Sequence, residues 1–182
     1  MGEVCANGRK NGVQIGGTGV NDGNIIGGNS LVGIGVQRVS IQAYGAFITP
    51  QKLSILGNSI YDTTPASSGP FATSGLGIDL FTGIDTDSSP DGVANTYADI
   101  GVTANDASDP DIGPNNYINF PVLNSFTQNG SQATVNLDLD AADSPSDEYR
   151  VEFFANDTTD PSGYGEGQIY LGAATLSSGD NQ

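Results

Sequence analysis

The sequence predicts an all-β protein, with short stacked strands in its first half and longer antiparallel strands in its second half. Gly accounts for 26 of the 182 residues and Pro for 9, so turns are frequent. Short aliphatic segments closed by Gly or Asn recur in the first half. In the second half apolar and polar residues alternate, which is typical of strands with one buried face. Helical spacing of apolar residues is convincing nowhere.

The first half contains short segments that resemble one another. Residues 24–30 read N-I-I-G-G-N-S and residues 54–60 read S-I-L-G-N-S-I, so a Gly-Asn-Ser triplet recurs. Residues 13–15 resemble residues 34–36, and residues 78–80 repeat the form. Strands this short cannot bury a face alone, but stacked coils bury each other's aliphatic side chains. Gly and Asn suit the corners because they tolerate positive φ.

Stacked coils carry two expectations about individual side chains. We expect Ile26, Ile55 and Ile78 to lie in one hydrophobic column. Asp79 stands between Ile78 and Leu80, which should point inward, so we expect its carboxylate to point outward.

An acidic, turn-rich junction follows the coils. Residues 105–116 read N-D-A-S-D-P-D-I-G-P-N-N, and the earlier stretch 85–92 reads D-T-D-S-S-P-D-G. Closely spaced carboxylates in Gly and Pro turns can converge on calcium, which takes six to eight oxygen ligands. The candidate ligands are Asp85, Asp87, Asp91, Asp106, Asp109 and Asp111. The alternative is that they are solvated turn residues that cap backbone groups.

Four strands are predicted after this junction. They cover residues 120–126, 133–140, 149–154 and 169–176, separated by turn clusters. The pattern fits an antiparallel, immunoglobulin-like β-sandwich, which needs about seven strands. Four strands alone would leave long unpaired edges, so we expect either a fragment of a longer protein or a sandwich completed by a partner.

Several of these stretches resemble bacterial extracellular parallel β-helix repeat proteins. The first half carries I-G-G-T-G-V-N-D-G-N-I-I-G-G-N-S and L-S-I-L-G-N-S-I-Y-D. The stretch G-V-T-A-N-D-A-S-D-P-D-I-G-P-N-N-Y-I-N-F-P-V-L resembles the junction motif of that family, and E-F-F-A-N-D resembles the domain that follows it. Residues 95–100 look like an insertion relative to the family pattern. The resemblance implies a right-handed parallel β-helix over 1–104, a junction loop over 105–118 and a partial immunoglobulin-like sandwich over 119–182.

Charge and composition exclude several classes of function. The chain has 21 acidic and 5 basic residues, a net charge of −16, which repels nucleic acids and anionic membranes. It has no His, which removes Ser-His-Asp catalysis and the usual zinc sites, and nothing is present to activate the single Cys5. Asp62 and Asp79 could be paired carboxylates for glycoside hydrolysis, but turn and strand-end positions explain them better.

The sequence therefore favours a non-enzymatic structural or adhesive segment of a bacterial secreted or cell-surface protein. Its expected partners are other copies or other domains of the same surface protein, and glycans, with no nucleic acid and no membrane insertion. Open strand edges favour self-assembly. The alternatives are a carbohydrate-active β-helix enzyme, a lyase or hydrolase, and a calcium-dependent glycan-binding module.

Overall fold

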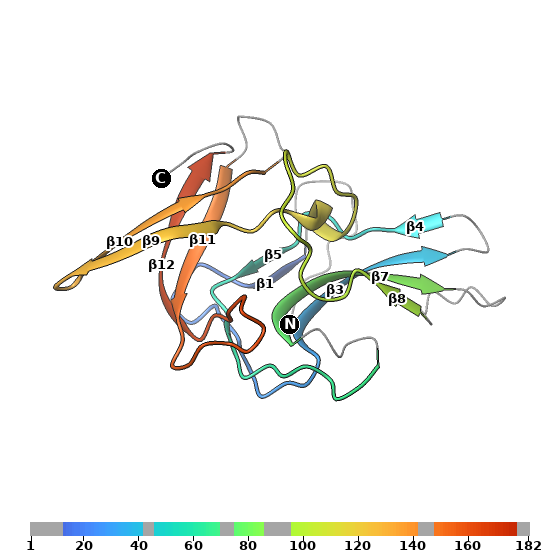
Figure 1. The fold of residues 1–182 in the computed structure, drawn as a ribbon, viewed down its shortest axis with the longest axis horizontal. Helices are drawn as coiled ribbons and strands as arrows, with labels where there is room; N and C mark the ends of the chain where they lie inside the picture. Colours follow the sequence, from blue (N-terminus) through green and yellow to red (C-terminus); the bar gives the residue numbers. More distant parts are fainter. Residues whose placement is uncertain (1–12, 42–45, 70–74, 86–95, 142–147, 178–182) are drawn as a thin grey trace.

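The protein is all-β, as the sequence predicts. A computed structural model describes residues 13–41, 46–69, 75–85, 96–141 and 148–177, and within these ranges it contains twelve strands and one short 3-10 turn (Figure 1). Within the same ranges, no helix has the length and apolar character needed to cross a membrane.

Six strands of the first half pair in parallel and in a repeated order. The first three strands along the chain pair one by one with three later strands, so the backbone passes the same three positions twice. The pairs are β1 (Gln14–Gly16) with β5 (Ser54–Leu56), β2 (Ile25–Gly27) with β6 (Ser59–Tyr61), and β3 (Val32–Ile41) with β7 (Leu76–Asp85). We call β1 to β3 the first round and β5 to β7 the second round.

Two further strands extend the longest of these pairs. Strand β4 (Ala46–Ile48) is antiparallel to β3, and strand β8 (Thr96–Ala98) is antiparallel to β7. The four strands form one sheet in the order β4-β3-β7-β8, which appears at the right of Figure 1. The sequence did not predict these antiparallel additions, because strands of three residues carry no readable alternation.

The repeated segments stack in a different register from the one that their similarity indicates. The Gly-Asn-Ser similarity aligns Ile26 with Ile55, whereas in the structure Ile15 pairs with Ile55 and Ile26 pairs with Ile60. The first triplet follows β2, whereas the second joins β5 to β6 and ends on Ser59, the first residue of β6. The triplet therefore marks corners in general, since Gly and Asn suit any turn with positive φ.

A small hydrophobic core lies between the two rounds. Ile34, Val36 and Ile60 are buried, and Ile26 and Ile55 pack against them. The expectation of one column is wrong for Ile78, which is 41% exposed. Leu80, which lies on the same face of β7 as Ile78, packs against the cluster instead.

A buried amide joins the two rounds beside this core. The Asn58 Oδ1 accepts hydrogen bonds from the Asn24 backbone N–H at 3.0 Å and from the Asn24 side-chain amide at 2.9 Å. The Asn58 Nδ2 donates to the Ile15 carbonyl oxygen at 2.9 Å. Because one side chain of the second round bonds both β1 and the segment before β2, it fixes how the rounds stack.

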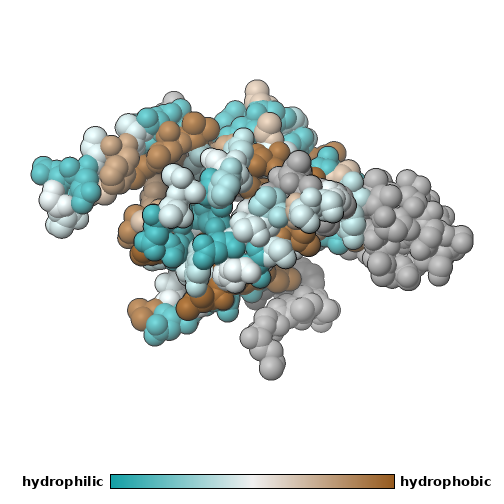
Figure 2. Space-filling view, turned by 60° about the horizontal axis from the view of Figure 1, so that its bottom comes forward, coloured by the Kyte–Doolittle hydropathy of each residue, from teal (hydrophilic) through white to brown (hydrophobic). Residues whose placement is uncertain are grey.

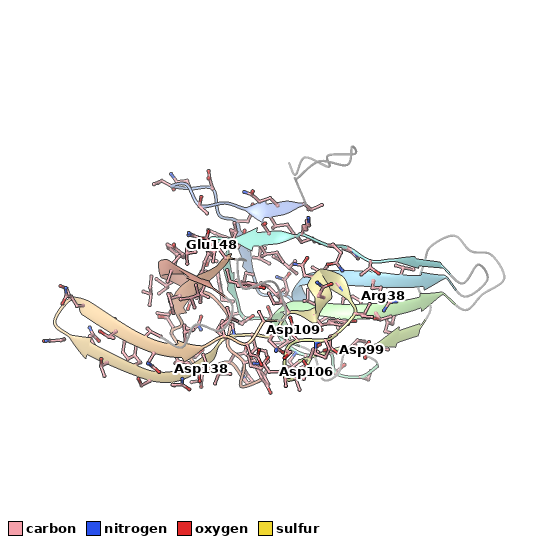
Figure 3. The ribbon with its side chains drawn as sticks, turned by 90° about the horizontal axis from the view of Figure 1, so that it is seen from above. Arg38, Asp99, Asp106, Asp109, Asp138 and Glu148 are labelled. Carbon is pink, nitrogen blue, oxygen red and sulfur yellow. The ribbon has the colours of Figure 1, made fainter. Side chains whose placement is uncertain are left out.

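All four predicted C-terminal strands are confirmed. They are β9 (Val122–Asn129), β10 (Gln132–Asp138), β11 (Glu148–Ala155) and β12 (Ile169–Ser177), and they form two antiparallel pairs, β9 with β10 and β11 with β12. Leu137, Leu139, Ala141 and Leu176 form a second core cluster, against which Val135, Tyr149, Val151 and Phe153 pack. The β9–β10 hairpin, which we call the arm, projects from the rest of the molecule in Figures 1 and 3.

Candidate functional site

A cleft separates the second round from the C-terminal strands. It has a volume of about 590 Å³, and its lining comes from β5, β6, β7 and β11, from residues 101–103 and 117–123, and from residues 164–167. Its apolar lining includes Ile60, Leu76 and Ile78, and Phe120, Phe154 and Tyr164 contribute aromatic rings. An apolar cleft of this size with a few polar groups is the usual form of a ligand site.

The aromatic rings of the cleft are held in edge-to-face pairs. Phe120 and Tyr164 have ring centroids 5.6 Å apart at 79°, and Phe154 and Tyr170 are 5.5 Å apart at 72°. Such pairs are preferred geometries, so they limit the orientations that each ring can adopt. Tyr164 nevertheless stays exposed, which leaves one aromatic surface open to a ligand.

Three carboxylates around the cleft bond to backbone amides of other segments. The Glu152 Oε2 accepts from the Gly57 N–H at 2.7 Å, and the Glu166 Oε1 accepts from the Thr63 N–H at 3.0 Å. The Asp79 Oδ2 accepts from the Gly101 N–H at 3.1 Å. Hydrogen bonds to a charged acceptor are about twice as strong as neutral ones. These carboxylates therefore join separate parts of the chain.

The expectation that Asp79 points outward is wrong, because its side chain is only 1% exposed. Strand β8 lies beside β7 in the same sheet, and the segment that follows β8 brings Gly101 to the face of β7 that carries Asp79 and Phe81. The Phe81 ring contacts the Tyr97 ring at 6.1 Å, and Asp79 accepts from Gly101. Strand alternation predicts which side chains share a face, but it does not predict whether another segment covers that face.

Asp62 and Asp79 lie in different environments. Asp62 is exposed at the end of β6 with a φ of 56°, whereas Asp79 is buried in the middle of β7. A glycosidase needs two carboxyl groups that face one substrate, one as acid and one as nucleophile or base. These two positions do not supply that arrangement.

The structure describes the side chains of three of the six candidate calcium ligands. Asp106 is exposed, Asp109 is buried and Asp111 is half-buried (Figure 3 labels Asp106 and Asp109). Within the described parts of the chain, no three His, Cys, Asp or Glu side chains form a group that could hold a metal. Asp87, Asp91 and the side chain of Asp85 lie outside the described residues, so the six-ligand set stays a prediction.

Asparagine side chains hold the acidic junction together. The Asn105 Oδ1 accepts from the Phe120 N–H at 3.0 Å, and its Nδ2 donates to the Phe120 carbonyl at 2.8 Å. Asn119 bonds Asp106 in the same way, at 3.1 and 2.7 Å, and its Nδ2 also donates to the Asp140 carbonyl at 2.7 Å. We call these two reciprocal pairs the amide clasp. The sequence indicated only that Asn favours turns, and nothing in it identified the partners.

A buried tyrosine lies between the junction and the four-stranded sheet. The Tyr117 hydroxyl lies 2.6 Å from the Thr82 Oγ1 and donates to the Asp99 Oδ2 at 3.4 Å. Burial is the largest effect that raises the pKa of this hydroxyl above 10.0. Tyr117 therefore keeps its proton at neutral pH and can donate to Asp99 while it accepts from Thr82.

Comparisons with protein-family models, with curated proteins and with solved structures found no match for this chain.

Proposed function

We propose that the chain is a non-enzymatic structural or adhesive segment of a bacterial secreted or cell-surface protein. In this proposal the two rounds belong to a right-handed parallel β-helix, and the C-terminal strands are part of an immunoglobulin-like sandwich. Three parallel pairs in the same order support the first assignment. Two antiparallel pairs packed around Leu137 and Leu176 support the second.

One observation carries the proposal: the polar side chains at the meeting of the two halves bond backbone groups. Glu152 and Glu166 reach from the C-terminal half to Gly57 and Thr63 of the second round. The Gly167 carbonyl accepts from the Ile60 N–H at 2.8 Å, and the Ser59 Oγ donates to the Gln168 carbonyl at 2.6 Å. These hydrogen bonds hold the C-terminal half against the second round. A fixed contact between the two halves suits a protein that transmits load or presents a surface.

The proposed partners are other copies or other domains of the same surface protein, and not nucleic acid or a membrane interior. A net charge of −16 repels polyanions and favours solvation of an extended extracellular protein.

Turnover assays on neutral and acidic glycans test the non-enzymatic role. We expect no turnover by the wild-type protein. Hydrolysis or elimination that disappears in Asp79→Asn, while the melting temperature stays the same, would overturn the proposal in favour of a carbohydrate-active enzyme.

A glycan-binding module is the second candidate, and the open Tyr164 ring in an apolar cleft favours it. Sugar rings pack their apolar faces on aromatic side chains, so a glycan array would detect affinity at this cleft. Tyr164→Ala should abolish any such binding, whereas Tyr170→Phe, which keeps the ring that packs on Phe154, should leave it unchanged.

Calcium at the acidic junction is part of the same proposal. Asp109 is buried at the junction, and calcium would offset some of the repulsion within a chain of net charge −16. A ligand that binds only the native state raises the melting temperature. We therefore expect chelation to lower it by several degrees, and an identical melting curve in calcium and in EDTA would contradict the site.

A further inference from the structure

The arm differs from the rest of the molecule in charge. No Asp, Glu, Lys or Arg occurs from Ile112 to Leu137, although the chain carries 26 charged residues in total, 21 acidic and 5 basic. All eight residues of β9 are exposed. Proteins usually protect an exposed edge strand with charged side chains, Pro or a β-bulge. Strand β9 has no charge and no Pro, and its one irregularity is a bulge at Asn124, where the pairing with β10 shifts by one residue.

The apolar stripe of the arm is covered on only one strand. Leu137 of β10 is opposite Leu123 of β9, and Val135 is opposite Phe126, so these four side chains share one face. Leu137 is 4% exposed in the core, whereas Leu123 is 61% and Phe126 is 54% exposed. Figure 2 shows hydrophobic surface along this projecting part of the molecule. The core thus continues past β10 onto β9, where nothing in the described chain covers it.

We propose that β9 pairs antiparallel with β9 of a second copy, so that two arms form one four-stranded sheet in the order β10-β9-β9-β10. This inference rests on the proposed structural role and names its partner. Strand addition supplies backbone hydrogen bonds along the free edge of β9. Antiparallel pairing about a two-fold axis between Asn124 and Ser125 places Leu123 opposite Phe126 of the second copy, which continues the apolar stripe.

Charge decides where a second copy can approach. Two chains of net charge −16 repel each other, so a contact between copies is least opposed where charge is absent, and residues 112–137, which include all of β9, are the longest uncharged run of the sequence. A cationic partner would instead be attracted to the acidic parts of the molecule. Because a two-fold contact uses the same strand on both copies, it closes at a dimer.

Sedimentation equilibrium over a wide concentration range tests the pairing. We expect wild-type protein to reach twice the 18.6 kDa mass of one chain and to go no further. Ser125→Glu places one negative charge on each side of the two-fold axis, within one residue of it, and should weaken the dimer by about tenfold or more.

Thr134→Glu is the matched control. Thr134 is exposed on β10, and its partner is Thr127, so it adds the same charge to the outward face of the arm one strand away from the proposed contact. It should leave the dimer intact. Circular dichroism and melting temperature should show that both variants fold as the wild type does.

Three results would overturn the pairing: a monomer at every concentration, assembly beyond a dimer, or loss of the dimer in Thr134→Glu but not in Ser125→Glu. If the protein is a strict monomer and turns over no glycan, the proposed dimer is ruled out but the proposed structural role is not. Glycan turnover by a stable dimer would remove the structural role and leave the pairing in place.

Discussion

At the scale of single residues, amide side chains act as substitutes for backbone pairing. Asn119 and Asn105 each offer one acceptor and one donor to the same neighbouring backbone unit, which is the pattern that a paired strand would offer. The segment between residues 99 and 121 contains no strand in the described structure, so its backbone groups need such partners. Asparagine supplies them without any regular strand.

Replacement of Asn119 by Ala should reduce the free energy of unfolding by about 2 to 3 kcal/mol, because backbone groups of Asp106 and Asp140 lose their partners. Urea unfolding would measure the change. Asn124→Ala is the control: Asn124 is exposed and makes one 3.3 Å contact with Asn136, so it should change stability by no more than about 0.5 kcal/mol. Equal effects of the two substitutions would contradict the amide clasp.

Tyr117 predicts a loss of stability at alkaline pH. Burial raises the folded-state pKa of its hydroxyl above the ordinary value of 10.0. The folded state therefore keeps this proton more tightly than the unfolded state, and the resulting stability is complete below pH 10 and is lost as the pH rises through the folded-state pKa.

Urea unfolding of the wild type and of Tyr117→Phe at a series of pH values would test this. Because the other tyrosines titrate in both proteins, their difference reports Tyr117 alone. The variant should lose less stability than the wild type above pH 10, and parallel pH profiles would contradict the prediction.

At the scale of elements, the sequence predicts strands well and their partners poorly. The four C-terminal strands were predictable because alternation is a local property of each strand, as in Ala133 to Asp140. The register of the rounds was not, because pairing of Ile15 with Ile55 depends on how long each connecting turn is. The cleft was also unpredictable, since its walls come from segments such as residues 57–60 and 164–167, which are distant in sequence.

Substitutions at two glycines with positive φ distinguish the cost of backbone strain from the cost of close packing. Gly16 has a φ of +78°, and a Cβ there would overlap the Leu56 carbonyl oxygen, whereas Gly28 has a φ of +69° and open space around it. Gly28→Ala should cost about 1 kcal/mol from strain alone. Gly16→Ala should cost about 3 kcal/mol, since β1 must also move away from β5.

Chemical unfolding of both variants would measure these costs. If Gly28→Ala destabilised the protein as much as Gly16→Ala, the close stacking of the two rounds at this corner would be contradicted.

At the scale of the whole molecule, the hydrogen bonds that join the two halves come from a small set of groups. In the part of the chain that the structure describes, Glu152, Glu166 and residues 167–168 bond the second round directly. A joint built from so few groups should be sensitive to the loss of two of them.

The double substitution of Glu152 and Glu166 by Ala should therefore uncouple the halves. Hydrogen bonds to charged groups contribute about 1.5 to 3 kcal/mol each, so we expect total stability to fall by at least about 2 kcal/mol. We also expect unfolding to change from one transition into two, with amides of β11 and β12 exchanging first. Differential scanning calorimetry and hydrogen exchange would measure this.

Glu148→Ala is the control, because Glu148 is exposed on the same strand, β11, away from the joint. A double variant that still unfolds in one step, with an unchanged midpoint, would show that the carboxylates do not couple the halves.

The joint also gives the stack of rounds a direction. Ile60 of β6 already pairs with Gly167, β8 already pairs with β7, and Glu152 occupies the amide of Gly57, so the outer side of the second round is taken. A further turn of backbone cannot be added there without displacing the C-terminal half. In the proposed β-helix a further coil would therefore stack on β1, β2 and the first part of β3, because β4 pairs only with residues 39–41, the last of β3. Such growth would be one-sided and would leave the arm free to link neighbouring molecules.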